Sequence, residues 1–212
     1  MLEVGLGTQA KLAQRVVLVR GDRLVAALGD GLASLDTVAD SDTLLARYPD
    51  VACDLLVLDL MMPGRIGSLT LLERVVAMRR DIPVVVYSGA NQPLLAQHAL
   101  DAGARAFVSK SSGIELALDA IRVVAAGGLY VDPHIDLELA RRHPWNGLTA
   151  GERSVIVSLA GGAHLLALAL DTERSYKTVT AHKYNALRKL GLSSKTDLKH
   201  YLTQIGLGYL LP

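Results

Sequence analysis

The sequence predicts two successive folds: an α/β domain built on a parallel sheet, and then a small all-α domain. Up to about residue 125, short Val- and Leu-rich runs alternate with segments whose apolar residues recur at helical spacing. This alternation is typical of βα units around a parallel sheet. Three of the apolar runs end in a polar side chain, namely Asp59, Ser88 and Lys110. From Leu148 onward the pattern is helical only.

The first domain is predicted to hold five strands and five helices. The predicted strands are 15–19, 35–39, 54–58, 82–88 and 104–110. The predicted helices are about 24–32, 41–47, 68–80, 93–102 and 113–126. Ser41 is the expected N-cap of the second helix, and Gly103 and Gly127 end the last two. This order predicts a flavodoxin-like doubly wound domain, whose ligand site lies beside strands one and three.

The predicted boundaries are 1–127 for the α/β domain, 128–146 for a linker and 147–212 for the helical domain. Pro133, His143-Pro144 and several charges favour the linker. Thr149 and Glu152 form a capping-box pair that begins the first helix of the second domain. The other three helices are expected at about 163–171, 175–190 and 195–205.

Charge and composition restrict the classes of function. Residues 1–135 hold 12 Lys or Arg and 15 Asp or Glu, whereas residues 136–212 hold 10 and 6. An acidic domain followed by a basic one favours a nucleic-acid partner for the second. The single Cys53 excludes an internal disulfide. We find no signal peptide and no apolar segment of membrane-spanning length, so we expect a cytoplasmic protein without a membrane partner.

The three strand-end residues resemble the receiver domain of two-component response regulators. By this resemblance, Asp59 is the phosphoacceptor, Ser88 moves to contact the phosphoryl group, and Lys110 pairs with it. Phe107 occupies the position that resembles the family's aromatic switch. A sensor kinase is then an expected partner.

The second domain resembles the LuxR-type helix-turn-helix proteins. The resemblance rests on Ser175-Tyr176-Lys177-Thr178-Val179-Thr180 and on Arg188-Lys189-Leu190-Gly191-Leu192-Ser193. It is nearest to the capsule-regulator (RcsB-like) branch, and it implies a dimer that binds double-stranded DNA. On a helical wheel, a cationic and hydrogen-bonding face opposes the apolar one. The predicted DNA-binding residues are Lys177, Thr180, Ala181, Lys183, Tyr184 and Arg188.

The receiver departs from its family at the end of strand one. The family carries two adjacent carboxylates there to hold Mg²⁺, whereas this chain reads Arg20-Gly21-Asp22-Arg23. We therefore expect Mg²⁺ to bind only weakly, through Asp22 and Asp59, because it prefers several oxygen ligands. Arg20 is available to pair with Asp59 and to replace the metal's charge. Two interpretations stay open: a working phosphoacceptor, and an atypical receiver that acts without phosphorylation.

The sequence thus predicts a transcriptional regulator and not an enzyme. One alternative is an auxiliary protein that forms heterodimers with another response regulator and does not bind DNA alone. The apolar segment 163–170 and the incomplete acidic site after strand one favour it. A phosphoryl-handling hydrolase that uses Asp59 is a weaker alternative, since no acid or His follows closely as a general acid or base.

Overall fold

A computed structural model describes residues 12–19, 32–194 and 196–211 of the chain, and the side chains from Asp36 onward. The predicted first helix, Arg20 and Asp22 lie outside these residues. The chain divides into two compact units. One holds the described residues up to Gly89 together with Ala102–Asp132, and the other holds Ala90–Asp101 together with the residues from Pro133 onward. Each unit is described by itself.

The first unit is built on a parallel sheet. Its strands are β1 (Leu12–Val19), β2 (Leu32–Val38), β3 (Leu55–Leu58), β4 (Val84–Ser88), β5 (Ala106–Ser109) and β6 (Tyr130–Val131). Their order is β2-β1-β3-β4-β5-β6, and every pairing is parallel. The five predicted strands and the doubly wound order are confirmed. β6 was not predicted, because two residues are too few for a pattern.

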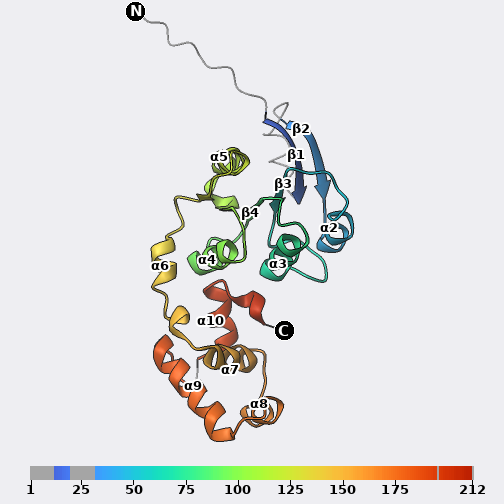
Figure 1. Ribbon diagram of the computed structural model, residues 1–212. Helices are drawn as coiled ribbons and strands as arrows, with labels where there is room; N and C mark the ends of the chain where they lie inside the picture. The colour runs from blue at the N-terminus through green and yellow to red at the C-terminus, as the bar shows by residue number, and fades with distance from the viewer. Residues whose placement is uncertain (1–11, 20–31, 195, 212) are drawn as a thin grey trace, which may run out of the picture. The chain divides into compact units, whose positions relative to one another are not determined.

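Helices cover both faces of this sheet. Figure 1 shows α5 (Ile114–Ala125) on one side and α2 (Ser41–Arg47) with α3 (Ser68–Met78) on the other. The apolar face of α5, which includes Ala117 and Ile121, packs on alternate residues of β3, β4 and β5. The predicted N-cap of α2 was wrong by one residue. The Asp40 side chain accepts the Thr43 N–H, and Ser41 is the first helical residue.

The second unit is helical. Its elements are α4 (Pro93–Asp101), α6 (Leu137–Arg141), η3 (Pro144–Gly147), α7 (Ala150–Ala160), α8 (Leu165–Asp171), α9 (Tyr176–Leu190), α10 (Leu198–Gln204) and η4 (Gly208–Leu210). The predicted capping box at Thr149 and Glu152 is present. Segment 128–146, predicted as a linker, contains β6, α6 and the first residues of η3. None of the helices in the described part of the chain has both the length and the apolar character that a membrane span requires.

Candidate functional site

The first candidate site lies at the carboxyl edge of the sheet. Asp59 follows β3, Ser88 ends β4, and Lys110 follows β5. β3, β4 and β5 are neighbours in register, with Ser88 opposite Ser109. The three predicted residues therefore meet at one edge, where the ligands of doubly wound sheets bind. Asp59 is only 4% exposed, and Ser88 is fully buried.

Two donors hold the Asp59 carboxylate. Lys110 Nζ lies 2.7 Å from Oδ2, and the Met61 N–H donates to Oδ1 over 2.8 Å. The Lys110 ammonium also lies 5.5 Å from the centroid of the Tyr87 ring, within cation–π range. An ammonium ion thus compensates the buried carboxylate, as a buried charge requires. Lys110 is the lysine predicted for this site, and the predicted pairing of Arg20 with Asp59 falls on a residue outside the described part of the chain.

Two further residues of this unit, Phe107 and Asp132, are buried. Phe107 is fully buried in β5, so its ring lies inside the unit and not on its surface. Behind Ser109, the buried Asp132 accepts the Ser109 N–H with Oδ2 over 3.0 Å. Sequence reasoning missed Asp132, since it lies in the predicted linker and only the pairing of β6 with β5 brings it here. It anchors the chain that leaves β6.

The described residues near Asp59 supply few possible ligands for a magnesium ion. Among residues 36–194 and 196–211, no three His, Cys, Asp or Glu side chains come together as a metal site. Asp59 is the carboxylate that follows β3, and Lys110 already contacts one of its oxygens. The described residues alone therefore do not fit Mg²⁺, which prefers six oxygen ligands. Asp22 lies outside them.

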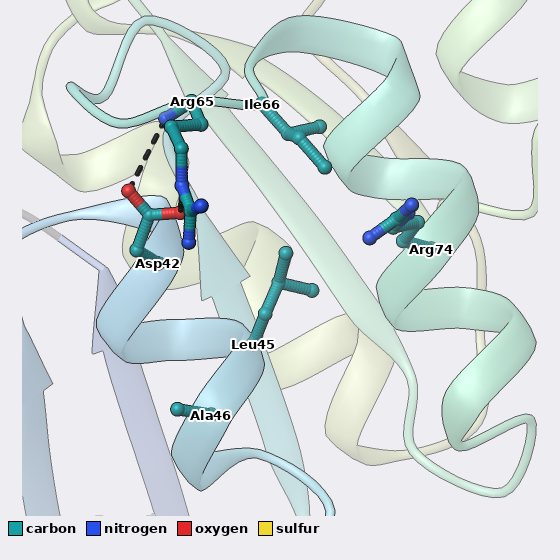
Figure 2. A pocket seen from close by; sticks show the side chains of 6 residues that line it. All are labelled: Asp42, Leu45, Ala46, Arg65, Ile66 and Arg74. Atoms are coloured by element: carbon teal, nitrogen blue, oxygen red, sulfur yellow. Dashed lines mark hydrogen bonds and ion pairs between the residues drawn. The ribbon is translucent and has the colours of Figure 1, made fainter.

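A pocket of about 440 Å³ lies on another part of this unit, between α2 and α3. Figure 2 shows Asp42, Leu45 and Ala46 of α2 facing Arg74 of α3, with Arg65 and Ile66 from the loop after β3. Arg65 Nε donates to Asp42 Oδ1 over 3.0 Å, but the Arg65 side chain is 86% exposed. Such a pair contributes about 0–1 kcal/mol to stability. The pocket includes none of the predicted site residues.

The second candidate site is the exposed face of α9. Ser175 caps this helix by accepting the Thr178 N–H, and Gly191 ends it at φ +67°. Val179, Ala186, Leu187 and Leu190 point into the unit. The exposed stripe consists of Lys177, Ala181, Tyr184 and Arg188, at helical spacing.

The other two predicted DNA-binding residues lie at the border of this stripe. Thr180 and Lys183 are half-buried. Thr180 Oγ1 is buried without a hydrogen-bond partner in the described structure. The Lys183 ammonium lies 5.2 Å from the centroid of the Tyr184 ring. Four of the six predicted residues thus point toward solvent. The Thr180 hydroxyl is buried, so it is not placed to contact DNA directly.

An ion pair between the buried Glu152 and the partly exposed Lys189 fixes α9 against α7. Lys189 Nζ lies 2.7 Å from Glu152 Oε2 and 3.1 Å from the Gly147 carbonyl oxygen. Glu152 Oε2 also accepts the Thr149 N–H over 2.8 Å. The Lys189 hydrogen bond, helped by the bonds to Thr149, holds the pKa of Glu152 below its ordinary value, although burial opposes this. The sequence showed the capping box but not its partner Lys189, which follows 37 residues later.

We predict that Glu152→Gln lowers the free energy of unfolding of the helical unit by about 1.5–3 kcal/mol at pH 7, since it removes a charged hydrogen-bond acceptor. Because the pKa of Glu152 is lowered by folding, the stabilisation is complete above the unfolded pKa of about 4.3 and is lost as the pH falls through the folded value. Urea unfolding between pH 3 and pH 7, followed by Trp145 fluorescence, measures both effects. Glu138→Gln, on the exposed face of α6, is the control. An equal loss in both variants would contradict the prediction.

The surface of α8 is unusually apolar. Leu166 and Leu170 are 62% and 72% exposed and lie one helical turn apart. Thr172 is exposed at the end of α8 and donates its hydroxyl to the Leu168 carbonyl. The helix before α9 therefore offers two leucines to solvent, which bears on the alternative of a protein partner.

Two families match the chain. The family described as "Response regulator receiver domain" matches residues 21–122, and "Bacterial regulatory proteins, luxR family" matches residues 146–202. The first match covers the strand-end site and the second covers α9. Both follow the order expected from the sequence.

Individual proteins align over most of the chain. Transcriptional regulatory protein UhpA of Salmonella typhimurium is 36% identical over 74% of this chain and 77% of its own length. Response regulator GacA of Pseudomonas viridiflava is 27% identical over 80% and 82%. Among solved structures, RcsB of Salmonella enterica serovar Typhimurium bound to a promoter superposes with a TM-score of 0.65 at 21% identity, covering 91% of this chain and 98% of RcsB.

Proposed function

This chain belongs to the two-component response regulators with a LuxR-family output domain, and we propose that it controls transcription by binding double-stranded DNA through α9. The observation that carries the proposal is the exposed stripe of Lys177, Ala181, Tyr184 and Arg188. A recognition helix in the major groove needs cations for phosphates or guanine and small or hydrogen-bonding groups near base edges. Because the family regulates transcription, we propose that the protein acts in the cytoplasm and that it is not an enzyme.

The DNA-bound form is proposed to be a dimer. RcsB, which shares this fold, has been solved bound to a promoter and as two dimers on two parallel DNAs. In a symmetric dimer, two α9 helices would enter major grooves about one helical turn apart, or ~34 Å. A sensor kinase and a second response regulator are further proposed partners.

Selection of duplexes from a random-sequence DNA pool by the wild-type chain tests the proposal. We expect enrichment of a two-fold symmetric site with half-sites about 10 base pairs apart. Binding should weaken steeply with salt because the contacting cations release counterions. Failure to enrich any sequence would favour the second candidate function, that of an auxiliary protein that binds another response regulator. The observation that favours this candidate is the exposed pair Leu166 and Leu170 on α8.

We also propose that signalling does not require phosphorylation of Asp59. The feature that supports this proposal is the segment after strand one, which reads Arg20-Gly21-Asp22-Arg23 in place of the family's adjacent carboxylates. The ion pair of Lys110 with Asp59 does not distinguish the two interpretations, because a working phosphoacceptor site by the family resemblance also holds this lysine. A regulator whose active arrangement is populated without a phosphoryl donor gains little from phosphorylation.

Asp59→Ala is expected to leave DNA affinity within about threefold of the wild type, or ~0.65 kcal/mol. Binding isotherms for both proteins, with and without acetyl phosphate, measure this. Asp81→Ala, at a side chain that is 70% exposed, is the control for removal of one acid from the same unit. A tenfold gain with acetyl phosphate that Asp59→Ala abolishes would establish the conventional mechanism instead.

A further inference from the structure

Helix α4 belongs to the receiver by sequence and to the helical unit by packing. Along the chain it lies between β4 and β5, within the receiver match at 21–122. In the structure, Ala90–Asp101 forms one compact unit with the residues from Pro133 onward. Leu94 of α4 is buried in the same apolar cluster as Trp145, Ile156 and Leu187. A receiver helix thus contributes a side chain to the core of the helical unit.

Polar contacts align α4 within this unit. His98 Nδ1 and the Tyr209 hydroxyl lie 2.7 Å apart, and the two rings meet edge to face with centroids 6.4 Å apart. Asn146 Nδ2 donates to Gln97 Oε1 over 3.2 Å and to the Ala140 carbonyl over 2.9 Å. Hydrogen bonds are directional, so the bonds to His98 and Gln97 favour one orientation of α4 within the unit, in addition to the burial of Leu94.

The turn between α10 and η4 lies against the first turn of α4 and the residue before it. Gly206 has φ +83°, and a Cβ placed there would lie 2.9 Å from the Cβ atoms of both Gln92 and Leu95. The position of a Cβ atom is fixed by its own backbone, so an added Cβ would force the start of α4 and the turn at Gly206 apart. Glycine at this position is therefore required both for the turn and for the approach of α4.

A surface pocket borders the contact near the start of α4. It has a volume of about 190 Å³ and lies among side chains of α4, α6 and α10 and the loop at His143. Its lining includes the exposed Leu139, so the pocket lies at the edge of the contact and not inside the core.

We infer that the surface formed by α6, α10 and η4 is an intramolecular docking site for α4. Docking leaves the recognition stripe free, since its contacts use Tyr209, Asn146, Gly206 and the buried face of α9. Lys177, Ala181, Tyr184 and Arg188 remain exposed. Docked α4 is therefore permissive for DNA binding and does not block it. This consequence rests on the proposed function, whereas the docking itself does not.

A pair of glycine variants in the full chain tests the docking. Gly206→Ala and Gly162→Ala both place alanine at positive φ, +83° and +92°, but a Cβ at Gly162 meets nothing within 4 Å. Hydrogen exchange reports local opening of each helix. We expect α4 amides to exchange at least tenfold faster in Gly206→Ala than in Gly162→Ala, with α9 amides alike in both. Equal α4 protection in the two variants would overturn the docking.

A second variant and a DNA measurement complete the test. Tyr209→Phe removes the bond to His98 without backbone strain, and it should also accelerate α4 exchange if Gly206→Ala does not fold. On DNA selected by the wild type, Gly206→Ala should bind no more tightly than Gly162→Ala. A several-fold gain in affinity would show that docked α4 inhibits binding, which would overturn the permissive role. A wild type that selects no DNA would refute the proposed function, while exchange would still decide the docking.

Discussion

Trp145→Ala should lower the free energy of unfolding of the helical unit by about 3–5 kcal/mol, because it removes a large side chain from a close-packed core. Trp145 is 1% exposed and packs with Leu148, Ile156 and Leu202. Since domains of this kind are stable by about 5–15 kcal/mol, the variant should retain little of its stability. Its DNA binding should be lost with the fold.

Circular dichroism during urea unfolding is the appropriate measurement, because Trp145 is the chain's one tryptophan and the variant loses its fluorescence. Leu139→Ala is the matched control, since Leu139 lies nearby in α6 but is 59% exposed. That variant should change the free energy of unfolding by no more than about 0.5 kcal/mol. A cost below about 1 kcal/mol for Trp145→Ala would mean that the helical unit does not depend on η3.

Local rules predicted α9 and the capping box well. Both depend on residues within one helical turn of one another, such as Ser175 with Thr178 and Thr149 with Glu152. The strand-end site could also be anticipated, since parallel strands bring their carboxyl ends to one edge. Its three residues come from strands that are neighbours in the sheet.

Contacts between distant segments could not be predicted from the sequence. Segment 128–146 has Pro133, Pro144 and charges, which are typical of a linker, yet Ile135, Ala140 and Trp145 are buried. Their burial depends on elements far from them in the chain: Trp145, for example, shares an apolar cluster with Leu94, which precedes it by about 50 residues, and with Leu202, which follows it by more than 50. The ion pair of Glu152 with Lys189 and the membership of α4 in the helical unit have the same origin. No periodicity within a short window carries such information.

Arg188→Ala should weaken binding to the selected DNA by about 1–3 kcal/mol, or roughly 5- to 150-fold, if Arg188 makes a base or phosphate contact in the major groove. The Arg188 side chain is exposed, and its described partner is the Asn185 side chain of the same helix, at 3.3 Å. Removal of this exposed side chain should change the free energy of unfolding by no more than about 0.5 kcal/mol. Affinity and stability should therefore separate in this variant, whereas Trp145→Ala should lose both.

The comparison needs a control that removes the same charge elsewhere, because any lost cation weakens binding to a polyanion. Arg142→Ala fits, since Arg142 is 77% exposed on the carboxyl end of α6 and pairs with Glu138. Isotherms at several salt concentrations distinguish the two kinds of contact. Loss of a phosphate contact reduces the salt dependence by about one ion and affects all sequences alike, whereas loss of a guanine contact relaxes specificity at one base pair. Equal affinities for Arg188→Ala and Arg142→Ala would mean that the stripe on α9 does not face DNA.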